Sequence, residues 1–347
     1  MKKITFTLVI ILTGLIIFSC GKKSGDKSVQ LNGAGATFPY PLYSKWFDEY
    51  SKIHKEVRIN YQSIGSGGGI KQLTEGTVDF GATDSPMTEE EQQLAESKNK
   101  TKVFHIPTAL GAVVLTYNVP DLEKTINLKA DVAVNIFLGK IKKWNDPQIV
   151  ADNPDIKLPD KEIVVIHRTD GSGTTYILTD FFSKISEEWK NNVGVAKTVK
   201  FPTGQGAKGN EGVSGSVKQI PYSIGYVELI YAIQNNLKYA NIQNANGEFV
   251  TPSLDAVTNA GKAMLNEMSE SLTVSLVNAK GEGVYPISSY TYLLVLEKYE
   301  DPAKANLLSD FLKWALTDGQ KLAKELGYSP IPPEVYQKAL EKINKIH

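Results

Sequence analysis

The chain of 347 residues is poor in the residue types that most often do chemistry. Cys20 is its only cysteine, so an intramolecular disulfide is excluded. The four histidines are His54, His105, His167 and His347. None of them has a second histidine four residues away or a cysteine at metal-ligand spacing. We therefore expect no metal site, no cofactor and no histidine acting as a catalytic base.

The chain also lacks an excess of either charge. It has 38 basic and 38 acidic residues, and setting aside Lys2 and Lys3 leaves the remainder slightly acidic. Nucleic-acid binding usually requires a basic excess, so no nucleic-acid partner is expected. Hydrophobic residues make up 41% and charged residues 22%, which excludes a disordered chain. Because the length exceeds that of a typical single domain, we predict a globular protein of two lobes.

One long apolar run is present, ITFTLVIILTGLIIF, and it follows the basic start MKK. It is short for a membrane span and is followed by small and polar residues, which is the arrangement of an export signal. Residues 1–19 are therefore predicted to be a signal peptide.

Cys20 follows this run directly, a position similar to the lipobox of bacterial lipoproteins. Ile17 and Phe18 stand where that pattern usually has Leu and Ala. Lipidation with palmitate at Cys20, followed by a polar linker to residue 27, would tether the protein to a membrane surface. The expected location is the periplasm or the outer face of the plasma membrane. An uncleaved anchor and a soluble secreted form are the alternatives.

Strand-like runs, glycine-rich turns and helical periodicity alternate from Leu31 onward. Residues 42–53, for example, place Leu42, Trp46 and Tyr50 at helical spacing. Such alternation predicts an α/β fold with mainly parallel strands. Two helices are expected at the C-terminus, around residues 310–326 and 333–343.

Two long β-rich runs, near Tyr117 and near Ser288, suit a chain that passes between lobes twice. We therefore assign residues 28–117 with 288–347 to lobe 1 and residues 118–287 to lobe 2.

Four loops share one design, in which a strand ends in Gly, Ser, Thr or Asp and a helix follows. They are GAGATF (33–38), GSGGG (65–69), TDSPMT (83–88) and RTDGSGTT (168–175). Helix N-termini carry unpaired N–H groups and partial positive charge, and ligands of open α/β sheets bind at the carboxyl ends of strands. A single loop of this kind is more often a capped turn, but four converging loops would form an oxyanion pocket.

The loop sequences match nucleotide-binding and hydrolase motifs less well. Phe38 stands where the dinucleotide fingerprint needs its last Gly, and GSGTT lacks the Lys of a Walker loop. Ile64 prevents a G-x-S-x-G elbow around Ser66. Arg168 at a strand end suits bidentate binding of a tetrahedral oxyanion, with Asp170 as its orienting partner. A surface ion pair is the alternative for these two residues.

Several stretches, in order along the chain, resemble the phosphate-binding proteins of bacterial phosphate ABC transporters. They are LNGAGATFPYPLYSKW, INYQSIGSGGGIKQLTEGTVDFGATDSPM, IFLGKIKKWNDP, HRTDGSGTTYILTDF, EEWKNNVG, KGNEGVSGSVKQIPYSIGYVE and GYSPIPPEV. The resemblance implies a type II periplasmic-binding-protein fold, with a mixed, mainly parallel sheet flanked by helices in each lobe and the ligand between the lobes. It also implies a monomer that binds inorganic phosphate and delivers it to a permease and, through it, to an ATPase.

The resemblance also implies site residues. Main-chain N–H groups of Ala36 and Phe38 would contact phosphate, and Arg168 would be the basic contact, oriented by Asp170. The other implied ligands are Thr37, Ser66, Asp84, Ser172, Gly173 and Thr174. Gly67 stands where the family often has Ser, which should leave the contact of Ser66 intact.

Asp84 would select the ligand, because phosphate near neutral pH has a proton to donate and sulfate has none. A buried carboxylate facing an oxyanion without a proton is unpaired and repelled. Receptors for arsenate, sulfate or molybdate are alternatives, and Asp84 argues against sulfate. An exported phosphatase using Ser66 or Ser172 as nucleophile and a surface adhesin are alternatives of other classes, although an enzyme is not expected.

Overall fold

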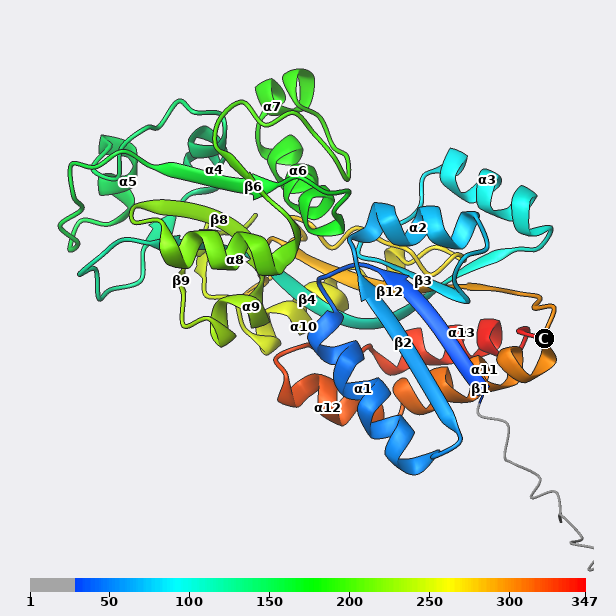
Figure 1. The fold of residues 1–347 in the computed structure, drawn as a ribbon. Coiled ribbons are helices and arrows are strands. Elements are labelled where there is room, and N and C mark those ends of the chain that lie inside the picture. The colour runs from blue at the N-terminus through cyan, green and yellow to red at the C-terminus, as the bar shows by residue number, and fades with distance from the viewer. Residues whose placement is uncertain (1–28) are drawn as a thin grey trace, which may run out of the picture.

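The computed structural model describes residues 29–347, so the predicted signal peptide and Cys20 lie outside the described residues. Two lobes share one sheet of nine strands (Figure 1). Its order is β2 (Val57–Ser63), β1 (Val29–Gly35), β3 (Phe80–Thr83), β12 (Ser288–Leu296), β4 (Val103–Asn118), β8 (Ser223–Glu228), β6 (Val164–Arg168) and β7 (Gln205–Ala207), with β9 (Lys238–Tyr239) beside β4. A smaller sheet contains β11 (Phe249–Val250), β10 (Asn241–Gln243) and β5 (Asn127–Leu128).

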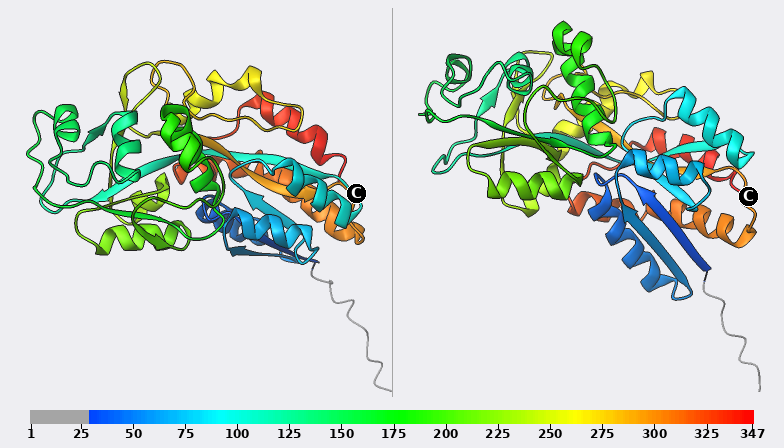
Figure 2. Two further views of the ribbon diagram at one scale, coloured as in Figure 1. Left: turned by 90° about the horizontal axis from the view of Figure 1, so that it is seen from above. Right: turned by 45° about the horizontal axis from the view of Figure 1, so that its top comes forward.

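Helices flank this sheet, as the views in Figure 2 show. Those around β1–β3 and β12, which we call lobe 1, are α1 (Tyr40–Ile53), α2 (Ser66–Thr74), α3 (Glu89–Asn99), α11 (Pro302–Ala315), α12 (Gly319–Glu325) and α13 (Pro333–Ile343). Those around β6–β8, which we call lobe 2, are α4 (Ala130–Phe137), α5 (Pro147–Asp152), α6 (Gly173–Ile185), α7 (Glu187–Asn192), α8 (Gly209–Gln219) and α9 (Leu229–Gln234). Helix α10 (Leu254–Ala263) and the short 3-10 helix Leu265–Glu267 precede β12. None of the helices within residues 29–347 is long and apolar enough to cross a membrane.

Strand β4 belongs to both lobes. Its residues 103–112 pair with β12, and its residues 113–118 pair with β8, both in antiparallel register. Every residue of β4 except the last is buried. A strand covered on both faces needs a mainly apolar sequence, which residues 103–118 have.

The shared sheet is mixed, and the α/β two-lobed prediction is confirmed. Strand β1 runs parallel to β2 and β3, and β6 runs parallel to β7 and β8. Strand β12 is antiparallel to both β3 and β4. The parallel strands of lobe 1 end together at Gly35, Ser63 and Thr83, so the loops that follow them start from one edge of the sheet.

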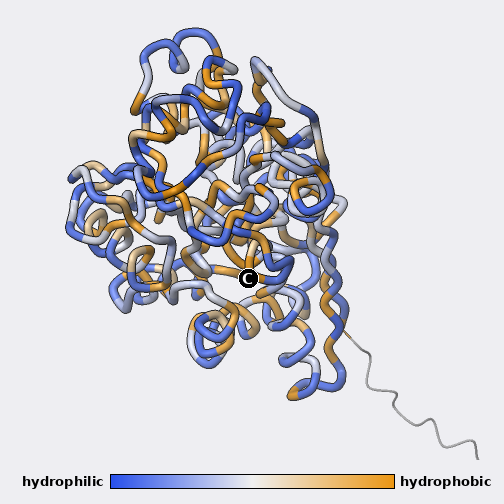
Figure 3. Tube along the Cα trace, turned by 90° about the vertical axis from the view of Figure 1, so that its left-hand side faces the viewer, coloured by the Kyte–Doolittle hydropathy of each residue, from blue (hydrophilic) through white to orange (hydrophobic). Residues whose placement is uncertain are grey.

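The helices bury the faces that their periodicity predicts. In α1, Leu42, Trp46 and Tyr50 are buried, whereas Ile53 at the last position is exposed. Figure 3 shows the same arrangement along the chain, with hydrophobic segments inside and hydrophilic ones on the outer turns. Helix α3 begins with a capping box between Thr88 and Glu91.

The prediction of one helix across residues 310–326 is wrong, because the segment contains two helices, α11 and α12. The break lies beside Trp46 of α1. The indole of Trp46 donates a hydrogen bond to the carbonyl of Gly319 at 2.7 Å, and a Cβ on Gly319 would lie 3.0 Å from that indole nitrogen. Packing against Trp46 therefore determines where α12 starts.

Glycines allow helix α2 to begin directly at the end of strand β2. Gly65, the residue before the helix, has a φ of 89°, which side chains disfavour. A Cβ on Gly69 would lie 2.5 Å from the carbonyl oxygen of Ala34 and 2.5 Å from the Cα of Gly35. The first turn of α2 therefore packs against the main chain of β1, which holds the N-terminus of α2 close to the sheet edge.

This close approach predicts opposite effects for two helical glycines. Gly69→Ala should lower the free energy of unfolding by about 1–3 kcal/mol, because main-chain atoms cannot move aside as side chains do. Gly215→Ala in α8 has no atom within 4 Å of its new Cβ, so it should raise that free energy by up to about 1 kcal/mol. Urea unfolding of both variants is the measurement. Equal changes in the two variants would show that helix propensity alone determines the effect of each substitution on the free energy of unfolding.

Candidate anion-binding site

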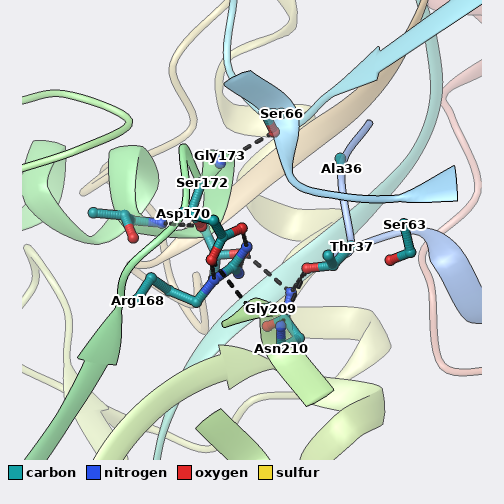
Figure 4. Close-up of polar contacts among 12 residues, drawn as sticks. Ala36, Thr37, Ser63, Ser66, Arg168, Asp170, Ser172, Gly173, Gly209 and Asn210 are labelled. Atoms are coloured by element: carbon teal, nitrogen blue, oxygen red, sulfur yellow. Dashed lines mark hydrogen bonds and ion pairs between the residues drawn. The ribbon is translucent and has the colours of Figure 1, made fainter. Parts of the chain in front are cut away.

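Three of the four predicted loops meet at the contact between the lobes, where Thr37, Ser66 and Arg168 lie (Figure 4). Asp84 of the remaining loop lies within 3.4 Å of Ser66. Helices α2 and α6 begin inside their loops, at Ser66 and Gly173. In the other two loops the helix starts later, at Tyr40 and Glu89, so the loop residues themselves face the site. The predicted residues from both lobes are buried together: Ala36, Thr37, Phe38, Ser66, Asp84, Arg168, Ser172, Gly173 and Thr174.

Three tyrosine hydroxyls hold the main chain of the first loop. The carbonyl of Ala36 accepts from Tyr61 at 2.7 Å, that of Thr37 from Tyr231 at 2.6 Å, and that of Phe38 from Tyr328 at 2.7 Å. Tyr231 belongs to lobe 2, so this contact also joins the lobes.

Ala36 differs from the expectation that its N–H is free to contact a ligand. This N–H donates to the carbonyl of Ala82 at 3.0 Å and therefore continues the pairing of β1 with β3. Phe38 is left as the predicted main-chain donor of this loop.

Arg168 is held by Asp170 in a bidentate ion pair. Nε and Nη2 of the guanidinium donate to the two carboxylate oxygens at 2.8 and 2.5 Å, and Nη1 lies 3.4 Å from the hydroxyl of Thr174. The Gly209 N–H donates to Asp170 at 3.0 Å. Burial alone would raise the pKa of Asp170, but Arg168 and the Gly209 N–H outweigh it and hold this pKa below its ordinary value. The predicted orienting contact is thus present, and the surface alternative fails because the Arg168 side chain is 1% exposed.

Asn210, near the start of α8, was not predicted and joins the lobes. Its side-chain NH₂ donates to the hydroxyls of Thr37 at 2.7 Å and Thr174 at 3.3 Å, and its side-chain oxygen accepts from the Glu228 N–H at 2.9 Å. The sequence held a signal for it, because AKGNEG has the same glycine-before-helix pattern as the four loops.

Ser66 and Gly67 contact the N-terminal turn of α6 across the lobes. The hydroxyl oxygen of Ser66 accepts from the Gly173 N–H at 3.1 Å, and the Gly67 N–H donates to the carbonyl of Gly171 at 2.9 Å. Ser172 caps α6 by accepting from the Thr175 N–H at 3.1 Å, so its own hydroxyl proton stays available as a donor.

Asp84 brings a carboxylate to these donors. Its Oδ1 accepts from the hydroxyl of Thr291 at 2.8 Å, and its Oδ2 lies 3.4 Å from the hydroxyl of Ser66. The pKa of Asp84 is raised to about 7, because the effect of burial exceeds the opposing effects of the Thr291 hydrogen bond, the charge of Arg168 and the Ser66 hydrogen bond. Asp84 can therefore exchange a proton with a partner near neutral pH.

A second buried carboxyl group is that of Glu228, whose N–H donates to the side-chain oxygen of Asn210. Burial raises its pKa well above the ordinary value, and its Oε2 accepts from the Ile230 N–H at 2.7 Å. Across the part of the chain that the structure describes, no cluster of His, Cys, Asp or Glu is suited to a metal ion. The site therefore consists of hydroxyl and main-chain donors, one paired guanidinium and the carboxylate of Asp84.

Comparison with known proteins agrees with this geometry. Residues 21–319 match the family model described as a PBP superfamily domain. The chain is 45% identical over 309 residues to the phosphate-binding protein PstS of Pasteurella multocida, covering 89% of this chain and 88% of that protein. It is 46% identical over 307 residues to PstS of Haemophilus influenzae, covering 88% and 90%.

Solved structures share the fold at lower identity. The periplasmic phosphate-binding protein PfluDING, solved with bound phosphate, superposes with a TM-score of 0.73 at 20% identity, covering 90% of this chain and 93% of that one. The phosphate binding protein of Stenotrophomonas maltophilia gives a TM-score of 0.70 at 19% identity, again covering 90% and 93%. From the model match, and from relatives more than 40% identical across most of its length, the chain belongs to the PstS family of phosphate-binding proteins within the PBP superfamily.

Proposed function

We propose that this protein binds inorganic phosphate between its lobes, outside the plasma membrane, and delivers it to the permease of an ABC transporter. Family membership makes it a binding protein and not an enzyme. The observation that carries the proposal is the buried carboxylate of Asp84 beside the N-terminus of α6, where a Cβ on Gly173 would lie 2.6 Å from Asp84 Oδ2. A protonated tetrahedral oxyanion satisfies both groups at once, since it accepts from N–H and donates to the carboxylate.

The proposed phosphate ligands are those predicted from sequence without Ala36, with Arg168 as the cationic contact and Asp170 as its partner. Thr37, Phe38, Ser66, Ser172, Gly173 and Thr174 supply hydroxyl or main-chain donors. Asn210 is added because it bonds to Thr37 and Thr174 in opposite lobes. We further propose lobe boundaries at residues 117 and 288, export by the signal peptide, and lipid anchoring at Cys20.

Removing the charge of Asp84 should reduce selectivity. A site that hydrogen-bonds a substrate proton can reject the analogue lacking it by about 10⁴-fold, and Asp84→Asn should lose most of that preference for phosphate over sulfate. Titration calorimetry with both anions measures it. Asp152→Asn, which alters a buried carboxylate paired with Lys129, is the matched control and should keep the selectivity. Unchanged selectivity in Asp84→Asn would remove Asp84 from the proposed site.

The same variant should change stability with pH. The folded-state pKa of Asp84 is about 7, above its ordinary value, so ionisation destabilises the folded protein increasingly as pH rises towards 7. Without phosphate, the stability of Asp84→Asn relative to wild type should therefore increase by about 2–3 kcal/mol from pH 5 to pH 8. Unfolding at both pH values tests this. A difference that does not vary with pH would exclude the raised pKa.

Asn210→Ala should weaken phosphate binding about tenfold or more, because it removes hydrogen bonds between the lobes. Asn153 is a matched control, since it is also buried and its side chain makes three hydrogen bonds within lobe 2. Asn153→Ala should reduce stability but keep phosphate affinity. Equal losses of affinity in both variants would assign to Asn210 only a general structural role.

A further inference from the structure

A β-bulge lies beside Thr291, whose hydroxyl contacts Asp84. Between β12 and β4, Thr291 pairs with Ala109 but Tyr292 pairs with Pro107, so Thr108 is an extra residue on β4. Pro107 has no N–H to donate to the ladder, which fits an irregularity at this point. Bulges redirect side chains, and this one places a threonine hydroxyl among the groups around Asp84.

Buried hydroxyls connect the bulge to Asp84. The hydroxyl of Thr108 lies 2.7 Å from that of Tyr43 and donates to the carbonyl of Thr291 at 3.1 Å. Thr291 in turn donates its own hydroxyl proton to Asp84 Oδ1 at 2.8 Å. Tyr43, Thr108 and Thr291 are all 0% exposed, so water cannot replace these contacts without rearrangement.

The two oxygens of Asp84 therefore differ. Oδ1 has a short hydrogen bond within lobe 1, whereas Oδ2 has a long contact of 3.4 Å to Ser66. Oδ2 is also the oxygen nearest to lobe 2, beside Gly173 at the start of α6. Of the two oxygens, Oδ2 is thus the one placed to accept a proton from a bound anion.

We propose that Thr291 is a positioning residue that sets the selectivity of the site. By donating to Asp84 Oδ1, it keeps Asp84 as an ionised acceptor whose Oδ2 requires a proton on the ligand. This inference rests on the proposed binding of phosphate. Without the Thr291 hydroxyl, Asp84 would more readily take a proton itself, and a protonated carboxyl can donate to an anion such as sulfate that has no proton.

Among the groups around Asp84, Thr291 contributes most to keeping its carboxyl group ionised. Arg168 is the cationic group that lowers its pKa, and Arg168 is already paired with Asp170. The other ionisable groups that interact electrostatically with Asp84 are Tyr43, Tyr61, Glu228, Tyr292 and Tyr328, and burial raises the pKa of each of them. None of these groups supplies a positive charge, and hydrogen bonding by Thr291 is the largest influence that favours ionised Asp84.

The experiment measures Asp84 directly and its selectivity separately, using the full chain and the variants Thr291→Val and Thr291→Ser. Carbon NMR of labelled aspartate carboxyl groups gives the titration midpoint of Asp84 without ligand, with Asp84→Asn used for assignment. Calorimetry with inorganic phosphate and with sulfate between pH 5 and 9 gives the selectivity. Thr116→Val is the matched control, because Thr116 is a fully buried strand threonine with one hydroxyl bond to a carbonyl, that of Lys238.

Thr291→Val should raise the midpoint of Asp84 by about one pH unit, and sulfate should compete about tenfold better near neutral pH. Thr291→Ser, which keeps the hydroxyl, and Thr116→Val should both behave as wild type. Thr291→Ala serves as a second hydroxyl-free variant if Thr291→Val does not fold. A folded hydroxyl-free variant with the wild-type midpoint and selectivity would overturn the inference. Failure of wild type itself to bind phosphate would instead overturn the proposed function.

Discussion

The continuity of strand β4 through both lobes constrains the rest of the structure. One half of this strand pairs with β12 and the other half with β8, so neither lobe has a complete sheet without it. Because β4 is almost entirely buried, the lobes are joined by core structure and not by an exposed linker. The strand-end loops of the two lobes consequently face each other, and buried polar groups such as Thr37 and Asn210 pair across the contact.

Charge in the site is nearly balanced before any anion binds. The guanidinium of Arg168 is paired with Asp170, and Asp84 has a pKa of about 7. In the proposed site, neutral dipoles would be the main contacts of an anion and would replace the hydrogen bonds that it loses from water. With such an arrangement, a single proton on the anion can affect the binding affinity. An excess of positive charge would attract anions with and without that proton alike.

The sequence indicates which residues lie in the strand-to-helix loops, but it does not indicate the contacts between them. Residues such as Asp84 and Arg168 follow recognisable strand-to-helix patterns, and local patterns survive folding. Asn210 lies in the same pattern, but asparagine is common in ordinary turns, so its side chain does not stand out in the sequence. Thr291 stands within an apolar β-rich run, where threonine is also common for its strand propensity. Its contact with Asp84 depends on the pairing of β3 with β12, and nothing in either segment specifies that pairing.

Gly67 and Gly171 meet where the lobes touch, and a Cβ on either would lie 3.1 to 3.2 Å from the Cα of the other. The spacing between the lobes at this point is therefore fixed by main-chain atoms, which have no rotamers to adjust. Because this contact is rigid, it limits the size of a ligand that can lie between the lobes. Size discrimination can then come from the backbone itself, independently of the role proposed for Asp84.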